Sequence, residues 1–422
     1  MPEPTRWHTS PNLALNQQVA ERRAAGERII HLGFGESRLP VFGPLAERLA
    51  TGAREGGYGP VAGSAGAREA AAGYFGRRRL PTSADQIVLG PGSKPLLMAL
   101  QHVLPGDVLL PRPAWNSYAP QVRLAGKRAY GVPIPAECGG VPDPAAVREV
   151  VRSARAAGGD PRVVILTLPD NPTGTLAPPA LIREIGALAR ELDLVIVSDE
   201  IYRDIVHDPA TPFLSPAEIA PERTVITTGL SKTLAIGGWR VGVCRFPETE
   251  AGRRARDGVV SVASDVWSTL AVPMQEVTAY AFAEPPEIRE RLADSARLHG
   301  VVAREVHRIM TAAGADCRPP TGAFYVYPDF GPLRGLLAGK GVTGSDSLQR
   351  HLLDAHGVMV LAGHHLGDDT SALRFKAATS MLYGDTVKEQ EESLAAPDPL
   401  TLPHVADVLT RLEEAIGELA GG

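Results

Sequence analysis

Short β-rich apolar runs alternate with stretches of helical periodicity between about residues 85 and 245. This alternation is typical of a parallel sheet whose strands are joined by crossover helices. Most of the runs are apolar on both faces, as strands buried between two layers of helices should be. The sequence therefore predicts an α/β fold with a mainly parallel sheet between helices. The expected strands span residues 86–89, 108–110, 162–168, 194–197, 224–228 and 240–246.

The pattern changes after about residue 285. Pro285 and Pro286 open a long charged stretch in which apolar residues recur at helical spacing up to Gly314, and this predicts a connecting helix. We expect a smaller α+β domain after it, and we expect the acidic, proline-containing residues 384–399 to form a surface connection. The expected strands of this domain span 323–327, 358–361 and 373–377, and its expected helices span 346–356 and the residues from about 403 onward.

The chain is expected to divide into three parts. A length of 422 residues fits two or three domains of about 150 residues each. The first 40 or so residues have no sheet of their own, so we expect them to pack against the C-terminal domain. The expected parts are an N-terminal segment over residues 1–45, a large domain over 46–285 and a small domain over 286–422.

Composition argues against several classes of protein. The 43 Lys and Arg residues against 48 Asp and Glu residues leave a net charge of −5, which disfavours a strongly basic nucleic-acid binder. No stretch approaches the roughly 18 to 20 apolar residues of a membrane span, and residues 1–12 lack the apolar core of a signal peptide. Cys138, Cys244 and Cys317 lie far apart without a CxxC pair, so we expect neither a disulfide framework nor a metal site. We expect a cytoplasmic protein that binds neither nucleic acid nor membrane.

Polar residues follow several of the expected strands. In an open α/β sheet ligands bind beyond the carboxyl ends of the strands, so these residues are site candidates. The run 90–94 (GPGSK) follows the first strand and precedes a helical pattern, so its amides could bind a phosphate group at the helix start. The run matches neither GxGxxG nor the P-loop motif, and by itself an ordinary strand-to-helix turn is its more ordinary interpretation.

Three more strand ends carry reactive side chains. Prolines and a glycine at 169–174 (PDNPTG) hold Asn171 in a rigid turn. Asp199 and Tyr202 follow the next strand, and Lys232 follows the one after it, with Arg240 shortly beyond. A buried carboxylate is unfavourable without a cationic partner. An acid, an amine and an arginine at adjacent strand ends are hard to explain as packing alone.

In their order, these segments resemble the class I/II aminotransferase family of fold type I pyridoxal-phosphate enzymes. The resemblance begins at Ser10 and covers nearly the whole chain. Any one motif could occur by chance, whereas the ordered set is specific. The motifs that carry it are Tyr58-Gly59, GPGSK at 90–94, Pro113-Ala114-Trp115, LPDNPTG at 168–174, SDEIY at 198–202, GLSKTLAIGGWRVG at 229–242, PPTGAFYVYP at 319–328 and LRFKAATS at 373–380.

The resemblance implies roles for four side chains around the ring of the cofactor, pyridoxal 5'-phosphate. Lys232 is expected to form the Schiff base with its aldehyde and later to move a proton between substrate Cα and cofactor C4′. Asp199 is expected to pair with the pyridine nitrogen, which makes the ring an electron sink. Tyr202 and Asn171 are expected to hydrogen-bond the phenolic oxygen.

The resemblance also implies how the rest of the cofactor and the substrate are held. Trp115 is expected to stack on the pyridine ring, and Arg374 to clamp the substrate α-carboxylate with help from Asn171 and the backbone of Gly35. Tyr58 is expected to reach the phosphate from the partner subunit, which implies a homodimer with shared active sites. The expected phosphate ligands are the amides of Gly92, Ser93 and Lys94, the hydroxyl of Ser231 and the guanidinium of Arg240.

The chain departs from the family pattern at two places. The family often carries Ser or Thr three residues before the lysine, where this chain has Gly229, so one phosphate hydroxyl could be missing. Residues 35–39 (GESRL) replace the common GEPDF, which leaves the specificity loop at the site entrance open to interpretation. Arg38 could meet an acidic substrate side chain there, although a solvated surface arginine is the more ordinary interpretation.

The sequence thus predicts a homodimeric pyridoxal-phosphate aminotransferase that moves an amino group between an α-amino acid and a 2-oxo acid. The nearest alternative keeps the cofactor but changes the outcome to β- or γ-elimination, to formation of an aminocyclopropane carboxylate, or to amino-acid oxidation. The cofactor motifs do not separate these reactions, because they share an early intermediate. A helix-turn-helix regulator is disfavoured by the few residues before the aminotransferase-like start and by the acidic net charge. A dehydrogenase is disfavoured because no strand-to-helix turn carries GxGxxG.

Overall fold

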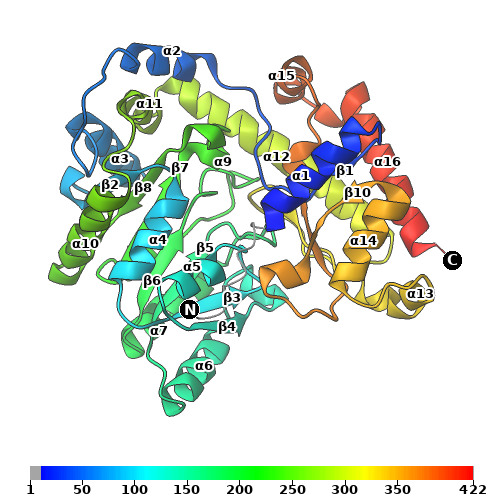
Figure 1. Ribbon diagram of the computed structural model, residues 1–422, viewed down its shortest axis with the longest axis horizontal. Helices are drawn as coiled ribbons and strands as arrows, with labels where there is room; N and C mark the ends of the chain where they lie inside the picture. Colours follow the sequence, from blue (N-terminus) through cyan, green and yellow to red (C-terminus); the bar gives the residue numbers. More distant parts are fainter. Residues whose placement is uncertain (1–10, 422) are drawn as a thin grey trace, which may run out of the picture.

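The largest sheet of the protein has seven strands in the order β2-β8-β7-β6-β5-β3-β4 (Figure 1). The computed structural model describes residues 11–421. Residues 1–10, which hold most of the stretch inspected for a signal peptide and the Ser10 at which the resemblance begins, lie outside the described residues. The strands are β2 (Ile87–Gly90), β3 (Asp107–Arg112), β4 (Ala129–Pro133), β5 (Pro161–Thr167), β6 (Val195–Asp199), β7 (Thr224–Gly229) and β8 (Gly242–Arg245).

The strand pairs of this sheet are parallel except those of β8, which runs antiparallel to β2 and to β7. The α/β class with a mainly parallel sheet is therefore confirmed. β4 is a strand that the sequence analysis missed. It lies at the sheet edge, and Val132 is its only buried residue, so it lacks the continuous apolar run that marks the central strands.

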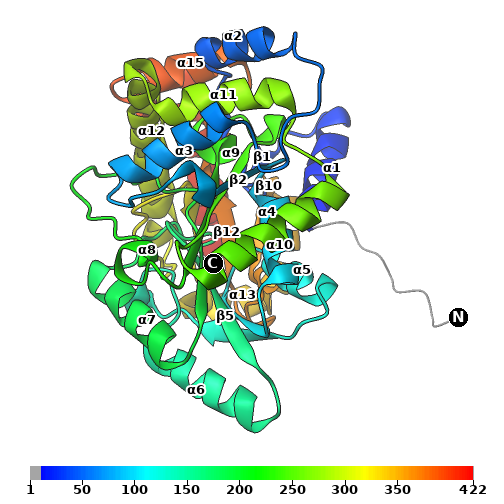
Figure 2. The ribbon, with the colours of Figure 1, turned by 90° about the vertical axis from the view of Figure 1, so that its left-hand side faces the viewer.

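Helices cover both faces of the sheet (Figures 1 and 2). Successive residues of β2 alternate between the two layers, since Val88 packs on one side while Ile87 and Leu89 pack on the other. Burial on both faces explains why most of these strands carry apolar residues on both sides. One layer contains α4 (Ser93–Val103), α5 (Tyr118–Leu124) and α10 (Glu250–Val266). The other contains α3 (Ala65–Arg77), α6 (Pro144–Ala156), α7 (Pro179–Glu191) and α11 (Val272–Ala283).

A second group of elements lies beside this sandwich, on the right of Figure 1. The long helix α12 (Pro286–Ala312) leads into it, as the sequence predicts. Its three-stranded antiparallel sheet has the order β11-β12-β9. The elements are β9 (Tyr325–Val326), β10 (Val358–Met359), β11 (Leu361–Ala362), β12 (Phe375–Ala378), α13 (Arg334–Gly339), α14 (Ser345–His356), α15 (Val387–Ala395) and α16 (Pro403–Ala420).

The prediction of a plain surface connection over residues 384–399 was wrong, because α15 lies within it. Thr386 and Glu389 cap the start of this helix reciprocally, with the Thr386 hydroxyl accepting from the Glu389 amide. This is the T-x-x-E capping pattern, and the acidic composition of the segment concealed it. The apolar run 358–361 also differs from the prediction, since it forms two short strands, β10 and β11, instead of one.

The N-terminal residues contact this second group. Strand β1 (Ile30–His31) pairs in parallel with β10, and α1 (Pro11–Ala24) packs beside it (Figure 1). The domain limits at residues 45 and 285 stay predictions. Three short helices complete the described chain: α2 (Gly43–Gly52), α8 (Pro216–Ile219) and α9 (Leu230–Thr233). Over residues 11–421, no helix is both long enough and apolar enough to cross a membrane.

Candidate active site

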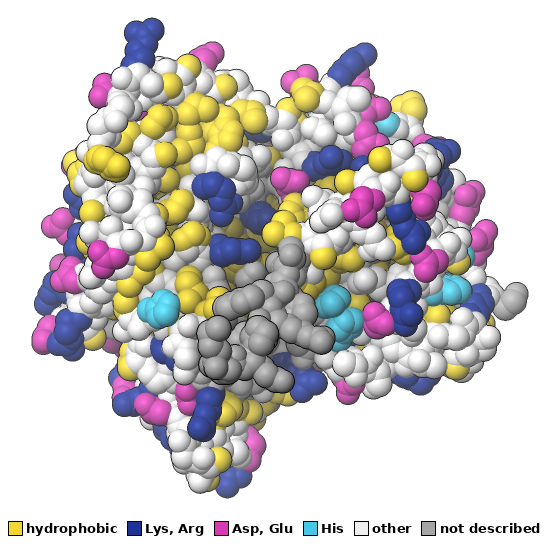
Figure 3. Space-filling view, viewed as in Figure 1, with side chains coloured by type: hydrophobic (Ala, Val, Ile, Leu, Met, Phe, Trp, Pro, Cys, Tyr) yellow, Lys and Arg dark blue, Asp and Glu magenta, His cyan; other side chains and the backbone are white. Residues whose placement is uncertain are grey.

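A cavity of about 520 Å³ lies at the carboxyl ends of β5, β6 and β7, next to the second group of elements. Figure 3 shows a hollow between the two halves of the molecule, with Lys and Arg side chains inside it. Ten of the residues singled out from the sequence line this cavity: Gly35, Ser93, Lys94, Trp115, Asn171, Asp199, Tyr202, Ser231, Lys232 and Arg240.

Asp199 ends the central strand β6 and is buried, with 3% of its surface exposed. Its Oδ2 accepts a hydrogen bond of 2.7 Å from the Tyr118 hydroxyl, and its Oδ1 accepts one of 3.3 Å from the Ile201 amide. Burial raises the pKa of Asp199 to about 6, although the Tyr118 hydrogen bond acts in the opposite direction. No ion pair to this carboxylate occurs among the described residues. The Asp199 carboxylate is therefore fixed by hydrogen bonds but has no positively charged partner. It can pair with a protonated nitrogen of a ligand in the cavity.

Lys232 lies on α9, directly after β7. Its ammonium donates a hydrogen bond to the carbonyl oxygen of Gly35. Burial lowers the pKa of Lys232 to about 8, while Glu36 partly opposes this shift. An amine with a lowered pKa is neutral more often near pH 7 and is a better nucleophile toward a carbonyl carbon.

Close packing explains the glycine three residues before Lys232. A Cβ at Gly229 would lie 2.4 Å from the carbonyl oxygen of Val241, so a serine or threonine does not fit without a shift of the backbone. The cavity therefore contains the hydroxyl of Ser231 but none at position 229.

The turn between β2 and α4 forms one end of the cavity. Gly92 has a φ of 94° and caps α4, and a Cβ there would lie only 2.3 Å from Nη2 of Arg240. Gly92 itself does not line the cavity, but its missing side chain makes room for the guanidinium. Arg240 adopts a left-handed φ of 62° and donates from Nη1 to the Gly237 carbonyl oxygen at 2.6 Å. A helix start, an arginine and the Ser231 hydroxyl at one place fit a phosphate group.

Asn171 and Tyr202 contact each other across the cavity floor. The Asn171 amide nitrogen donates to the Tyr202 hydroxyl at 3.3 Å, and this hydroxyl lies 2.6 Å from that of Tyr325. Burial raises the pKa of Tyr202, so the phenol stays protonated. The Asn171 Oδ1 atom is buried and has no hydrogen-bond partner within residues 11–421. This Asn171 oxygen can therefore accept a hydrogen bond from a bound ligand.

Two of the expected residues lie away from the cavity in the single chain. Tyr58 is 94% exposed. Arg374 is held outside the cavity lining by two acids, since its Nε donates to Asp329 at 2.7 Å and its Nη1 contacts both oxygens of Asp368 at 3.2 Å. Arg374 therefore does not line the cavity of the single chain, and its role as the carboxylate clamp stays a prediction.

Tyr118, Tyr325 and Lys376 are among the cavity residues that were not singled out from the sequence. Tyr118 holds Asp199, and its position three residues after Trp115, at the start of a helix, was a usable signal. Tyr325 contacts Tyr202, but its aromatic run resembled an ordinary strand. Lys376 lines the cavity from β12, in the same motif as Arg374. Nothing in the sequence ranks this lysine above the arginine two residues earlier.

Comparisons with known proteins agree with the geometry. The family model "Aminotransferase class I and II" matches residues 28–382. The aspartate/prephenate aminotransferase of Thermus thermophilus is 32% identical over 334 residues, which cover 77% of this chain and 82% of that protein. The aspartate aminotransferase of Geobacillus stearothermophilus is 28% identical, covering 90% of this chain and 95% of that one. A solved structure of T. thermophilus aspartate aminotransferase with maleate superposes with a TM-score of 0.78 at 27% identity, covering 92% and 95% of the two chains.

Proposed function

The chain belongs to the aminotransferase class I and II family, and we propose on that premise that Lys232 and Asp199 are its central catalytic side chains. It is a pyridoxal-phosphate-dependent aminotransferase, which moves an amino group between an α-amino acid and a 2-oxo acid. The observation that carries the assignment is that the amine and the acid meet in one cavity without forming an ion pair with any described residue. When bound, pyridoxal phosphate supplies an aldehyde that condenses with amines and a ring that accepts the electron pair released at Cα.

Lys232 has two tasks in this proposal. Its amine would hold the cofactor aldehyde covalently until a substrate amine replaces it. Once free, the Lys232 Nζ would take up the proton of substrate Cα and later give it back. A pKa of about 8, lowered by burial, suits a group that must both accept and donate a proton near neutral pH.

Asp199 holds the pyridine nitrogen in its protonated form. Tyr118 and the Ile201 amide fix the carboxylate in place, so its charge is preorganised toward the cavity. Asn171 and Tyr202 would hydrogen-bond the phenolic oxygen of the ring, and Trp115, which lines the same cavity, would stack on the ring. The phosphate would be held at the start of α4 by the amides of Ser93 and Lys94, together with Ser231 and Arg240, whereas the Gly92 amide already donates to the Gly90 carbonyl oxygen at 2.7 Å.

We further propose a dicarboxylic amino acid such as aspartate as the amino donor. The relatives named above are aspartate aminotransferases, and one of them was solved with maleate, which is a dicarboxylate. Lys94 and Lys376 also line the cavity and are not needed for the cofactor ring. Two cations in addition to Lys232 suit a substrate that carries two carboxylates.

A homodimer and a cytoplasmic location complete the proposal. Tyr58 is 94% exposed in the single chain, which is unusual for a tyrosine and suits a side chain that completes the site of a partner subunit. Sedimentation of the purified protein tests this, with a mass of twice 44.7 kDa as the expected result.

The reaction is tested with the purified holoenzyme and single amino acids, without a 2-oxo acid acceptor. Conversion of the bound cofactor to pyridoxamine phosphate, with one equivalent of 2-oxo acid released, is the expected result. Ammonia release with the starting absorbance regenerated would instead favour a lyase or an oxidase. Borohydride reduction followed by peptide mass spectrometry should label Lys232, and a label on another lysine would contradict the assignment.

A further inference from the structure

Two lysines of the active-site cavity differ in their partners. Lys232 donates a hydrogen bond to the carbonyl oxygen of Gly35. Lys376 lies inside β12 with 1% of its surface exposed, and no hydrogen bond or ion pair to its ammonium occurs within residues 11–421. An unpaired buried ammonium is unfavourable, so the effect of its charge on neighbouring groups is large.

The two amines lie beside neighbouring aromatic rings. The Lys232 Nζ is 6.0 Å from the centre of the Phe324 ring, and the Lys376 Nζ is 5.1 Å from the centre of the Tyr325 ring. The centres of these two rings are 4.9 Å apart. Gly35 adds a second link, because a Cβ on it would collide with the Tyr325 hydroxyl. Gly35, which holds Lys232, is therefore in contact with Tyr325, which supports Lys376, and both lysines line one cavity.

The charges around the two amines are unequal. Lys376 pairs with no carboxylate of the described chain, and the charged group that acts on it is Lys232. His31 of β1 also lies within reach of the Lys376 charge, but burial lowers the pKa of His31 to about 4, so this histidine is neutral near pH 7. Lys232 has charges of both signs nearby, namely Glu36 after β1, Asp199 of β6, Lys94 of α4 and Arg240 before β8.

The two lysines also influence each other. Burial lowers the pKa of Lys232 to about 8 and that of Lys376 to about 7, and the charge of Lys232 adds to the effect of burial at Lys376. Repulsion between two ammonium groups is mutual, so a charge that disfavours a proton on one of them is equally disfavoured by a proton on the other. The two amines therefore titrate as a coupled pair.

We propose that Lys376 is a positioning residue that acts through Lys232: its positive charge disfavours a proton on the Lys232 nitrogen and keeps this nitrogen able to accept the proton of substrate Cα. The inference rests on the proposed function and deepens it, because it adds a residue that controls the protonation of the catalytic amine. Glu36 and Asp199 act in the opposite direction on Lys232. Arg240 acts in the same direction as Lys376, but the proposed function assigns it to the phosphate, whose negative charge would offset its own.

The test compares variants of the holoenzyme at two lysines. Lys376→Met and Lys376→Gln both remove the charge, one with an apolar and one with a polar side chain, so the result does not depend on the folding of a single variant. Lys376→Arg keeps a cation that stays protonated at every pH used. Lys388→Met makes the same chemical change on α15, where the lysine side chain is 84% exposed, and it is the control for the loss of one positive charge.

The first readout needs no turnover. The absorbance of the bound cofactor changes when the Lys232 nitrogen that carries it gains or loses a proton, so a pH titration without substrate follows this proton. The midpoint should rise by about 0.5 to 1 pH unit in Lys376→Met and Lys376→Gln, because a repelling charge is lost. It should not rise in Lys376→Arg, and in Lys388→Met it should stay within about 0.1 pH unit of the parent, because solvent and salt screen an exposed charge.

Two outcomes of this titration would overturn the proposal. One is an unchanged midpoint in both uncharged variants. The other is an equal rise in Lys376→Arg, which would show that packing at position 376, and not its charge, acts on Lys232.

The second readout is the pH profile of the half-reaction with aspartate. The acidic limb of kcat should move to higher pH in Lys376→Met by the same amount as the midpoint, so kcat should fall about 3- to 10-fold at pH 7 and recover at high pH. A loss that is equal at every pH would show a merely structural role. A raised KM with an unmoved limb would show that Lys376 acts only on the substrate. Either result would overturn the proposal.

The role of Lys376 and the proposed reaction fail separately. If the parent holoenzyme releases ammonia and forms no pyridoxamine phosphate, the proposed reaction is wrong, while a shifted midpoint in Lys376→Met still supports the action of Lys376 on Lys232. If the parent transfers the amino group but the midpoint does not move in the uncharged variants, only the role of Lys376 is wrong.

Discussion

Two groups of buried charges lie on opposite sides of the turn that carries Lys232, and they differ in whether their charges are paired. The closed cluster, which we define as Tyr74, Arg78, Asp204 and Glu284, lies behind the turn. Arg78 contacts Asp204 at 2.7 Å and Glu284 at 2.6 Å, and the Tyr74 hydroxyl donates to Asp204 at 2.8 Å.

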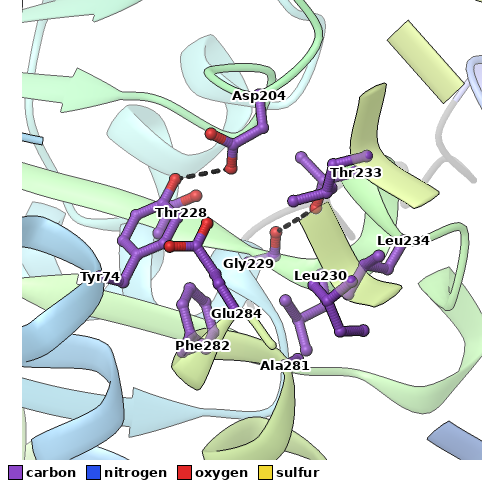
Figure 4. A pocket seen from close by; sticks show the side chains of 12 residues that line it. Tyr74, Asp204, Thr228, Gly229, Leu230, Thr233, Leu234, Ala281, Phe282 and Glu284 are labelled. Atoms are coloured by element: carbon purple, nitrogen blue, oxygen red, sulfur yellow. Dashed lines mark hydrogen bonds between the residues drawn. The ribbon is translucent and has the colours of Figure 1, made fainter. Parts of the chain in front are cut away.

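Figure 4 shows this side of the turn, with Tyr74 pointing toward Asp204 and with Gly229 and Thr233 of the Lys232 turn beside them. The void among these residues is about 10 Å³, barely room for one water molecule. Every charge in the closed cluster has an opposite charge at hydrogen-bond distance, and no space remains for a ligand.

The open cluster, which we define as Asp199, Lys232 and Lys376, faces the 520 Å³ cavity. Its three charges are buried or half-buried, and none forms an ion pair with a described residue. The comparison teaches that burial of charge alone does not mark a functional site in this protein. What distinguishes the active side is that charge, burial and empty space occur together.

The largest expected effect comes from the acid of the open cluster. Asp199→Asn keeps the size of the side chain and one acceptor oxygen, but it replaces the other oxygen by an amide donor and removes the charge that faces the cofactor nitrogen. We expect kcat to fall by about 10²- to 10³-fold, with no loss of thermal stability, because a buried charge is removed and not an ion pair. Steady-state kinetics and a melting curve on the same preparation measure both. If the variant has a lower melting temperature but an unchanged kcat, Asp199 stabilises the fold and takes no part in catalysis.

The closed cluster should respond in the opposite way. Asp204→Asn leaves Arg78 with Glu284 alone, and we expect the free energy of unfolding to fall by about 3 kcal/mol while kcat stays within about twofold. Urea unfolding measures the loss. Glu149→Gln, which breaks the exposed contact to Arg152, is the control and should leave the midpoint of urea unfolding unchanged. If Asp204→Asn and Glu149→Gln respond equally to urea, the ion pairs of the closed cluster do not stabilise the protein.

A buried histidine extends the comparison to pH. His299 is fully buried, its Nδ1 lies 2.6 Å from the Tyr383 hydroxyl, and burial, with smaller contributions from His207 and Arg291, lowers its pKa from 6.5 to about 3. The unfolded chain therefore binds a proton below about pH 6.5 that the folded chain does not take up until about pH 3. Stability is lost as the pH falls through this range, by about 2 kcal/mol at pH 5.

His299→Gln removes this contribution. The difference in free energy of unfolding between pH 7.5 and pH 5 should become smaller in the variant by about 2 kcal/mol. Urea titrations of both proteins at the two pH values measure it. An unchanged difference would show that His299 is protonated in the folded protein at pH 5.

The smallest expected effect separates the two cations of the LRFKAATS motif. Arg374→Met removes two partly exposed ion pairs and should lower stability by about 1 kcal/mol. Lys376→Met removes an unpaired buried charge and should leave the melting temperature of the ligand-free enzyme unchanged or raise it. A lower melting temperature for Lys376→Met than for Arg374→Met would show that Lys376 stabilises the fold, as the charges of the closed cluster do.

The elements predicted well are those whose signals are local. The central strands carry apolar residues on both faces because both faces are buried, and α12 has a helical apolar stripe, so each can be recognised without its neighbours. Edge strand β4 and helix α15 were missed or misread, since one has a single buried residue and the other an acidic sequence whose cap was overlooked. The antiparallel course of β8 was not foreseen, because an apolar run is the same in either direction.

The sequence by itself determined which chemistry the carboxyl edge of the sheet carries. Asp199 and Lys232 directly follow neighbouring strands, and parallel strands bring their carboxyl ends to one edge, so position in the chain already implied position in space. Only the tertiary structure decided which cation of a single motif faces the cavity. Arg374 and Lys376 differ by two positions, and their surroundings depend on Asp329 and Asp368, which come from other segments of the chain. A charge is paired or free according to what the fold places beside it, and a linear pattern does not contain that information.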